Sequence, residues 1–262
     1  MTDGASNAVI LSTMPPAQQQ GWHVLLDLGQ ERVFTQWCLI GGQLTLLHAA
    51  EHGVRKPQPT LDMDVVVNLV ERPGGTEWLA GWLVARGFEM DGVSPEGIGH
   101  RFTHAAGDDP RLGQVRFDIL APENMGQRAN LFTRRPARTV QAPGTRQALD
   151  RAQEVSVTVP AGGALPVRTG TIRRPSLLGA LVGKACAVRI ATRTHPERDL
   201  QDAAVLLACI QDPIAIADTL VVKDRRRLTA LQPLADADHP QWRTLDPADH
   251  QRGHDAVGFL LA

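Results

Sequence analysis

A short apolar run, a double glycine and an acidic strand follow one another in the first quarter of the chain. Trp37–Ile40 is typical of a buried strand, and Gly41-Gly42 ends it. The apolar residues that follow predict a helix that ends at Gly53, a residue type that commonly terminates helices. Residues 61–67 are rich in β-branched side chains and predict a second strand. Together with the helical pattern of the C-terminal part, these elements predict an α+β fold.

Asp62 and Asp64 stand at alternate positions of the second predicted strand. Side chains of a strand alternate between its faces, so both carboxylates point the same way and lie about 7 Å apart. A third acid, Asp118, lies in the later apolar run 114–120. If the two strands are neighbours, three carboxylates converge and form the oxygen-rich environment that Mg²⁺ requires. Paired acids are also common on solvated strand faces, but the apolar residues around these acids favour a compensating cation.

The chain changes character near residue 170, where strand patterns stop. We expect a partly ordered segment over residues 1–20, a core of strands and helices over 21–170 and a helical domain over 171–262. The helical domain has the apolar periodicity of three helices. These predicted helices cover residues 177–191, 196–210 and 214–231.

Other segments of the core also have clear patterns. Trp78 and Leu83 belong to an apolar stripe that predicts a helix ended near Gly87. Residues 100–104 and 114–120 predict an antiparallel pair around a turn at 107–110. A further strand is expected over 154–159.

Charge and cysteine content exclude several classes of protein. The 262 residues include 27 Lys+Arg and 28 Asp+Glu, a net charge of -1, so the chain lacks the overall positive charge of a protein that coats nucleic acid. Its three cysteines are far apart and predict neither a disulfide framework nor a paired-cysteine zinc site. No basic leader and no apolar stretch near the ~20 residues of a membrane span is present. We therefore expect a cytoplasmic protein with no membrane partner.

The order of the motifs resembles the nucleotidyltransferase superfamily of the DNA polymerase β type. The signature of that superfamily is an apolar strand, Gly-Gly or Gly-Ser, a helix, Asp-x-Asp and a later single Asp. The C-terminal half looks more narrowly like the AbiEii and MenT group of nucleotidyltransferase toxins, whose helical domain supplies a Lys and then an Arg/Lys-Asp-x-x-Asp motif. The matching residues, within roughly 35–210, are Leu39-Ile40-Gly41-Gly42, Asp62-Met63-Asp64, Asp118, Pro175-Ser176, Lys184 and Arg198-Asp199-Leu200-Gln201-Asp202.

The resemblance implies a nucleotidyltransferase core, with a mixed β-sheet flanked by helices, followed by a C-terminal helical domain. It also implies a nucleotide-binding set. Gly41 and Gly42 would let the backbone approach the phosphates, and Lys184 would neutralise phosphate charge. Thr60 matches the Ser or Thr that the group has two positions before its first metal-binding Asp, whereas Gln58 stands where an Arg is common.

The catalytic residues that the resemblance implies are Lys184 and four aspartates. Asp62, Asp64 and Asp118 would hold Mg²⁺, and Asp118 would also activate the attacking hydroxyl. Asp202 would position Lys184 or the acceptor.

The residues around Lys184 support its assignment independently. Lys184 is the only charge within residues 177–188, and a cation in such an apolar stretch requires an anionic partner unless it snorkels to the surface. Asp199 and Asp202 share a helix face. We favour Asp202 as the functional residue, because Asp199 follows Pro196 closely and could serve as an acid of the first helical turn.

Three other motifs are weaker. His48 and His52 lie one helical turn apart, but the nearby acid is not at the zinc-protease position, and we interpret them as helix-surface residues. Residues 179–185 are similar to the sequence of a phosphate-binding loop, but they lack the Ser or Thr that such a loop requires. The run Lys223–Arg227 could contact an RNA backbone, although such runs are most often a solvated helix face.

These features together predict a Mg²⁺-dependent nucleotidyltransferase that moves an NMP from an NTP to an acceptor hydroxyl. The resemblance implies a toxin of a toxin-antitoxin system that acts on tRNA, with a cognate antitoxin protein as a partner. Two alternatives stay open: an antibiotic or other small-molecule nucleotidyltransferase, and a catalytically silent binding module with the same fold. A wide acidic pocket would favour a cationic antibiotic, and a basic groove would favour RNA.

Overall fold

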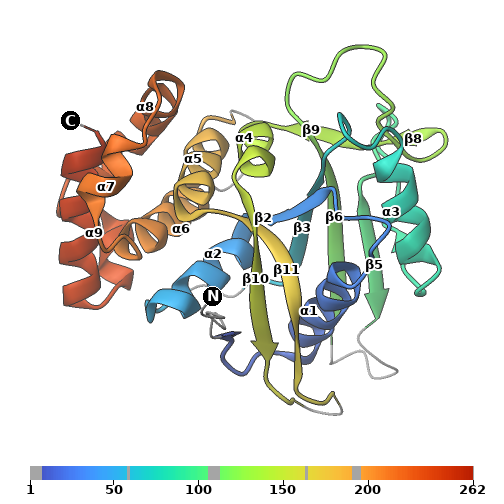
Figure 1. Cartoon of the computed structure of the whole chain (residues 1–262), viewed down its shortest axis with the longest axis horizontal. Helices are drawn as coiled ribbons and strands as arrows, with labels where there is room; N and C mark the ends of the chain where they lie inside the picture. Colours follow the sequence, from blue (N-terminus) through green and yellow to red (C-terminus); the bar gives the residue numbers. More distant parts are fainter. Residues whose placement is uncertain (1–7, 58–59, 106–112, 163–164, 191–195, 262) are drawn as a thin grey trace, which may run out of the picture.

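The computed structural model describes residues 8–57, 60–105, 113–162, 165–190 and 196–261 (Figure 1). The protein has an α+β fold with mixed β-sheets and a largely helical C-terminal region. Figure 1 shows α6 to α9 gathered at one end of the molecule and the strands at the other. The C-terminal helices are α5 (Leu177–Val188), α6 (Pro196–Ala208), α7 (Pro213–Asp218), α8 (Val222–Leu228) and α9 (Pro247–Leu260), with 3-10 helices at Thr229–Ala235 and Pro240–Thr244.

The larger sheet contains the two aspartate-bearing strands as direct neighbours. Its order is β2-β3-β6-β5-β4, with β9 also paired to β6. β3 and β6 run parallel, and β5 is antiparallel to β6 as predicted. The predicted turn at 107–110 lies outside the described residues. The strands are β2 (Trp37–Ile40), β3 (Asp62–Val67), β4 (Glu89–Met90), β5 (Arg101–Ala105), β6 (Gln114–Pro122) and β9 (Val140–Ala142), and a separate pair is formed by β7 (Phe132–Arg134) and β8 (Ala137–Arg138).

A second sheet, in the order β1-β10-β11, lies beside the first. It contains β1 (Val9–Ile10), β10 (Ala152–Val159), which includes the strand predicted at 154–159, and β11 (Arg168–Pro175). β11 was not predicted and continues past residue 170, where strands were expected to stop. Its sequence contains three arginines and looks solvated. One of them, Arg174, is nevertheless buried, since its charge is paired with Glu51.

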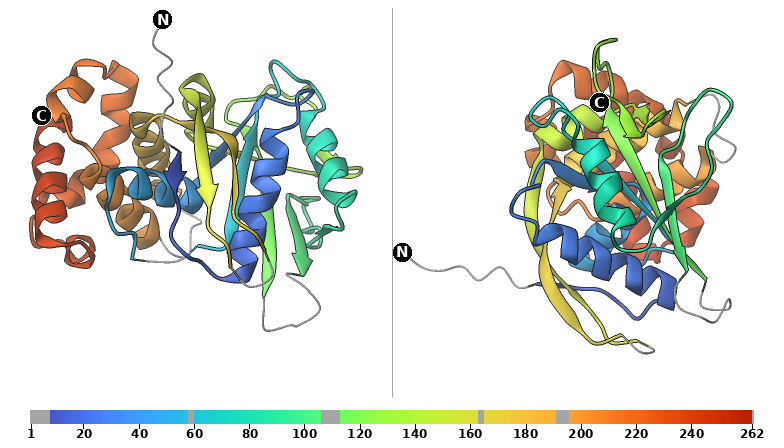
Figure 2. Two further views of the ribbon diagram at one scale, coloured as in Figure 1. Left: turned by 60° about the horizontal axis from the view of Figure 1, so that its bottom comes forward. Right: turned by 90° about the vertical axis from the view of Figure 1, so that its right-hand side faces the viewer.

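The described part of residues 1–20 contains more regular structure than its polar composition indicates. β1 and the first turns of α1 (Pro16–Gly29) lie within it, and Figure 2 shows α1 packed along the sheets. Polar composition concealed this helix because two of its three glutamines are buried and form hydrogen bonds to distant parts of the chain. Gln18 donates to Gln43 at 3.1 Å, and Gln19 donates to the backbone carbonyl of Pro160 at 2.7 Å.

The prediction of a single helix over 214–231 is wrong, because the structure divides this segment into α7, α8 and the 3-10 helix Thr229–Ala235. The chain is extended at Val221, where a new helix begins. The Asp224 carboxylate accepts a hydrogen bond from the Val221 amide at 3.5 Å, which satisfies one of the free amides of that new start.

The remaining helices border the larger sheet. α2 (Gly41–His52) begins directly after β2 and ends, as predicted, at Gly53 with a φ of 69°. α3 (Gly75–Val84) contains the predicted stripe, and its Trp78 stacks on Phe34 with ring centroids 4.3 Å apart. α4 (Thr145–Asp150) packs against α5. No helix in the described part of the chain has the length and apolarity needed to cross a membrane.

Candidate active site

The parallel register of β3 and β6 brings the three predicted aspartates together. Asp64 pairs with Asp118, and Asp62 pairs with Arg116 on the same strand as Asp118. All of the predicted site residues line one surface groove, which we call the polar groove. Four residues that were not selected from the sequence also line it: Lys56, Arg101, Arg198 and Asp199.

The double glycine makes room for two of these side chains. Gly41 has a φ of 73°, a conformation that glycine adopts without strain. A Cβ on Gly41 would lie 1.9 Å from Oδ2 of Asp64, and a Cβ on Gly42 would lie 2.9 Å from the Thr60 hydroxyl. Any larger residue would displace these groups. The same two glycines open α2, so the amides of that helix N-terminus border the groove.

A buried glutamine holds the Thr60 segment in place. Gln43 on α2 donates to the backbone carbonyl of Thr60 at 2.7 Å. Its own carbonyl accepts hydrogen bonds from Gln18 at 3.1 Å and from the Trp22 indole at 3.0 Å. α1 therefore supports the edge of the groove through the buried hydrogen bonds that Gln18 and Trp22 donate to Gln43.

Arg101 is the main cationic partner of the acids. It lies opposite Asp118 in the β5–β6 register, and its guanidinium donates to both Asp118 oxygens at 2.8 and 2.7 Å. It also approaches Asp62 at 3.8 Å. The hydrogen bonds to Asp118 raise the pKa of Arg101 above its usual value. Two-point pairing of this kind fixes the Asp118 carboxylate.

Lys184 lies on α5 and forms a buried network with α6. Its ammonium contacts Asp202 at 2.6 Å and Asp199 at 3.1 Å. Burial alone would lower the pKa of Lys184, but the two carboxylates outweigh that effect and raise it. Lys56 contacts the second Asp202 oxygen at 2.8 Å. The two lysines hold the pKa of Asp202 below its usual value although burial opposes ionisation.

Our preference for Asp202 over Asp199 is not supported by this geometry, because both acids contact Lys184. The side chain of Asp199 is 2% exposed, so it is not a solvated first-turn acid. Asp199 and Asp202 share a helix face, and this spacing was sufficient reason to predict both as site residues. Lys56 had no such signal, because its position beside Asp202 depends on a loop that periodicity does not describe.

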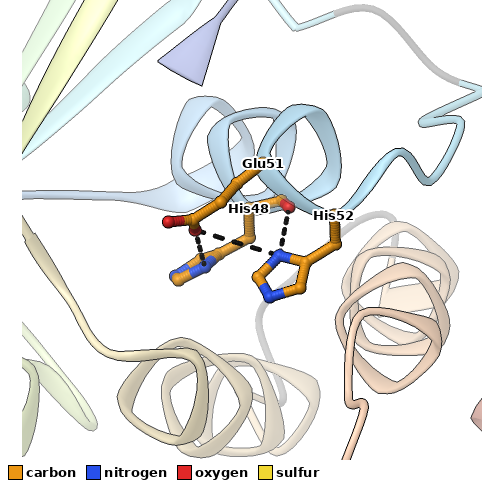
Figure 3. A group of neighbouring side chains, drawn as sticks. All are labelled: His48, Glu51 and His52. Atoms are coloured by element: carbon orange, nitrogen blue, oxygen red, sulfur yellow. Dashed lines mark hydrogen bonds and ion pairs between the residues drawn. The ribbon is translucent and has the colours of Figure 1, made fainter. Parts of the chain in front are cut away.

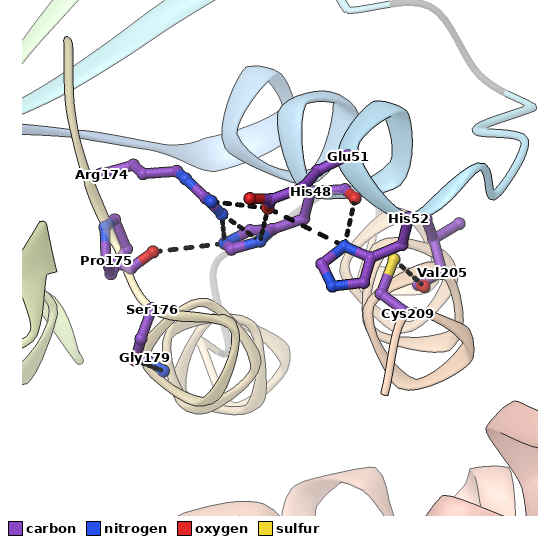
Figure 4. A network of polar contacts seen from close by, with 9 residues as sticks. All are labelled: His48, Glu51, His52, Arg174, Pro175, Ser176, Gly179, Val205 and Cys209. Atoms are coloured by element: carbon purple, nitrogen blue, oxygen red, sulfur yellow. Dashed lines mark hydrogen bonds and ion pairs between the residues drawn. The ribbon is translucent and has the colours of Figure 1, made fainter. Parts of the chain in front are cut away.

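The interpretation of His48 as a surface residue is wrong, since its side chain is 1% exposed. Figure 3 shows His48, Glu51 and His52 grouped on α2. Each offers one ligand atom, and these atoms lie within 4.8 Å of one another, a spacing suited to a metal. Figure 4 shows the guanidinium of Arg174 beside His48 and Glu51, on the side away from His52. Arg174 contacts His48 and pairs with Glu51 at 2.5 Å, and His48 contacts the Pro175 carbonyl at 3.2 Å. A buried arginine on these donors favours a structural network over a metal site.

This network predicts a pH dependence of stability. Burial lowers the pKa of His48 from 6.5 to about 4. The unfolded chain therefore binds the extra proton between these values, and stability is lost as pH falls from about 6.5 through about 4. We expect the free energy of unfolding to fall by about 3 kcal/mol from this group over that window. Denaturant unfolding of wild type and His48→Gln at several pH values tests this. An equally steep loss in both proteins would contradict it.

The other sequence motifs lie outside the groove. Residues 179–185 lie inside α5, so they do not form a phosphate loop. The Lys223–Arg227 run belongs to α8 and does not line the polar groove. Arg227 pairs with Glu123 at 2.9 Å, whereas Arg225 and Arg226 are exposed.

The donor set of the groove suits Mg²⁺. Carboxylate oxygens are the preferred ligands of this ion, and Oδ1 of Asp62 is buried without accepting a hydrogen bond, with Arg116 at 3.7 Å. In this structure the three aspartates do not meet the 4.8 Å spacing of the His48 group. Arg101 explains part of this separation, because it holds the Asp118 carboxylate. Joint ligation therefore requires the carboxylates to turn toward one another.

Comparison with models of known protein families finds no match, and comparison with curated proteins finds none either.

Proposed function

We propose that this protein is a Mg²⁺-dependent nucleotidyltransferase that moves an NMP from an NTP to an acceptor hydroxyl. The observation that carries the proposal is the register that places Asp64 beside Asp118, with Asp62 on the same strand and a Gly-Gly helix start against Asp64. A nucleotidyltransferase site needs these three acids side by side. The motifs are far apart in the sequence, so their proximity in the fold is independent support for the proposal.

The residues of the groove divide into two chemical groups. Asp62, Asp64 and Asp118 would hold Mg²⁺, which when bound would neutralise charge on the triphosphate. Lys184 supplies a fixed positive charge opposite the acids, and Asp202 holds its ammonium in place. The α2 N-terminus directs backbone amides toward the same space. Asp118 is the carboxylate that would take the proton of the acceptor hydroxyl, after release from Arg101.

The direct test of the substrate class is NTP binding. We expect isothermal titration to show Mg²⁺-dependent binding of at least one NTP to the wild type. Asp62→Asn is expected to weaken it at least about tenfold, because one carboxylate of the metal site is lost. Asp218→Asn, an exposed acid on α7, is the matched control and should bind as the wild type does. Binding that needs no metal, or that survives in Asp62→Asn, would contradict the proposed site.

We further propose that the acceptor is tRNA and that the protein is the toxin of a toxin-antitoxin pair in a reducing cytoplasm. The groove itself is close to neutral, with four cationic side chains beside five aspartates, so the RNA acceptor is supported by the resemblance of the sequence and by the exposed arginines of α8. Lys56, Lys184, Arg101 and Arg198 line the groove, and the three described cysteines are free and buried. An antitoxin protein that blocks the groove would be the expected partner.

The exposed arginines of α8 provide a test of the RNA acceptor. Charge reversal of both Arg225 and Arg226 is expected to weaken tRNA modification and to reduce its salt dependence, because phosphate contacts release counterions. NTP binding should not change, since neither residue lines the groove. Arg32→Glu with Arg134→Glu, two exposed positions elsewhere, is the matched control. Transfer to a cationic small molecule but to no RNA would replace the toxin proposal with the antibiotic-modifying one.

A further inference from the structure

A second cavity, which we call the apolar recess, adjoins the polar groove. Gly41, Asp64, Lys184 and Asp199 line both, so the two spaces share a wall. The rest of the recess is different in character. Ile40 of β2, Leu44 of α2 and Leu120 of β6 line it on one side, and Ala180, Gly183 and Ala187 line it from α5. A ligand that spans the two spaces therefore needs a charged end and an apolar end.

We propose that the recess binds the nucleobase of the NTP while the polar groove binds its triphosphate; this rests on the proposed function. A base is a flat group whose faces are apolar, and binding sites for such ligands are concave and mostly apolar. The α5 side of the recess carries small side chains at successive turns, since positions three or four apart share a helix face. Such a wall leaves a flat group free to lie against the helix.

The glycine at position 183 supports an open binding space over an incidental packing gap. Two other glycines of the recess are needed for the fold itself. A Cβ on Gly179 would lie 2.9 Å from the Pro175 side chain, and a Cβ on Gly144 would lie 3.0 Å from the Cys186 side chain. A Cβ on Gly183 would meet no atom within 4 Å. Glycine is unfavourable inside a helix, so this position keeps space free without any structural need for it.

The test fills the recess and compares two ligands that differ only in the nucleoside. Gly183→Leu should fold with an unchanged or higher thermal midpoint, because a better helix former enters open space. We expect wild type to bind one Mg²⁺·NTP at least about tenfold more tightly than Mg²⁺·tripolyphosphate, and Gly183→Leu to lose that preference while its tripolyphosphate affinity is unchanged. Gly81→Leu is the matched control, because that glycine of α3 also meets no atom within 4 Å and lines neither cavity.

Each result has a distinct meaning. An NTP preference that survives in Gly183→Leu, or that is absent from the wild type, overturns the recess as the base site and leaves the proposed function intact. Failure of wild type to bind either ligand overturns the proposed function and this inference together. If Gly183→Leu does not fold, Gly183→Ala takes its place. That variant adds one methyl group and is expected to give a smaller loss of the same preference, and an unchanged preference would overturn the inference.

Discussion

Asp64→Asn is expected to lower the rate of nucleotide transfer by at least about a thousandfold, the scale on which loss of a charge-stabilising catalytic group acts. Asp64 is the central acid of the site. It pairs with Asp118 across the parallel strands, and its oxygen occupies the space that a side chain at Gly41 would fill. Asparagine keeps the shape but removes the charge that a divalent cation requires. Incorporation of labelled NMP into the acceptor, with saturating NTP and Mg²⁺, measures the effect.

The fold of this variant should be intact. Without metal, the thermal midpoint is expected to stay within about 3 °C of the wild type or to rise, because the substitution relieves repulsion between neighbouring carboxylates. Asp218→Asn should transfer at the wild-type rate. Wild-type turnover by Asp64→Asn would remove the three aspartates from the mechanism, and a collapse in stability would make any loss of activity uninformative about the site.

Lys184→Met is expected to lower the free energy of unfolding by about 3 to 5 kcal/mol, as loss of one partner of a buried ion pair does. Lys184 lies between Asp199 and Asp202, and the side chain of Asp199 is almost fully buried. The substitution leaves both buried carboxylates without their shared cation, although Lys56 still contacts Asp202. Urea unfolding at neutral pH measures the loss. Transfer should also fall, because a fixed positive charge leaves the groove.

A double-mutant cycle separates this ion pair from simple loss of packing. Adding Asp199→Asn to Lys184→Met should recover part of the lost stability, since it removes one of the two buried charges that Lys184 neutralised. Lys184→Arg keeps the charge and should unfold at a higher urea concentration than Lys184→Met. Strict additivity, or a loss below about 1 kcal/mol for Lys184→Met, would contradict a buried network around this lysine.

The elements that sequence patterns predicted well are those with clear alternation or apolar periodicity. β2, α2, β3, α6 and the β5–β6 pair lie where they were expected. The elements that were missed have polar residues that are satisfied by partners distant in sequence. Gln19 bonds to the carbonyl of Pro160, and Arg174 of β11 pairs with Glu51. Composition treats such residues as solvated, because only the tertiary fold supplies their partners.

The same dependence on tertiary contacts explains which residues of the site could be predicted from the sequence and which could not. Alternation along β3 placed Asp62 and Asp64 on one face, and the parallel pairing with β6 adds Asp118. Arg101 was missed because its position opposite Asp118 depends on the register between two strands. Lys56 lies in a loop and reaches Asp202 across more than a hundred residues of sequence. Strand periodicity predicts which acids share a face, but it does not predict which cations neutralise them.

The most direct test of the central claim is incubation of the protein with Mg²⁺, total tRNA and each of the four NTPs in turn, labelled at the α-phosphate. The account predicts that at least one NTP transfers label to RNA in the wild type and that Asp64→Asn transfers none. Label in the RNA from both proteins alike would contradict the account, as would label from neither with any NTP.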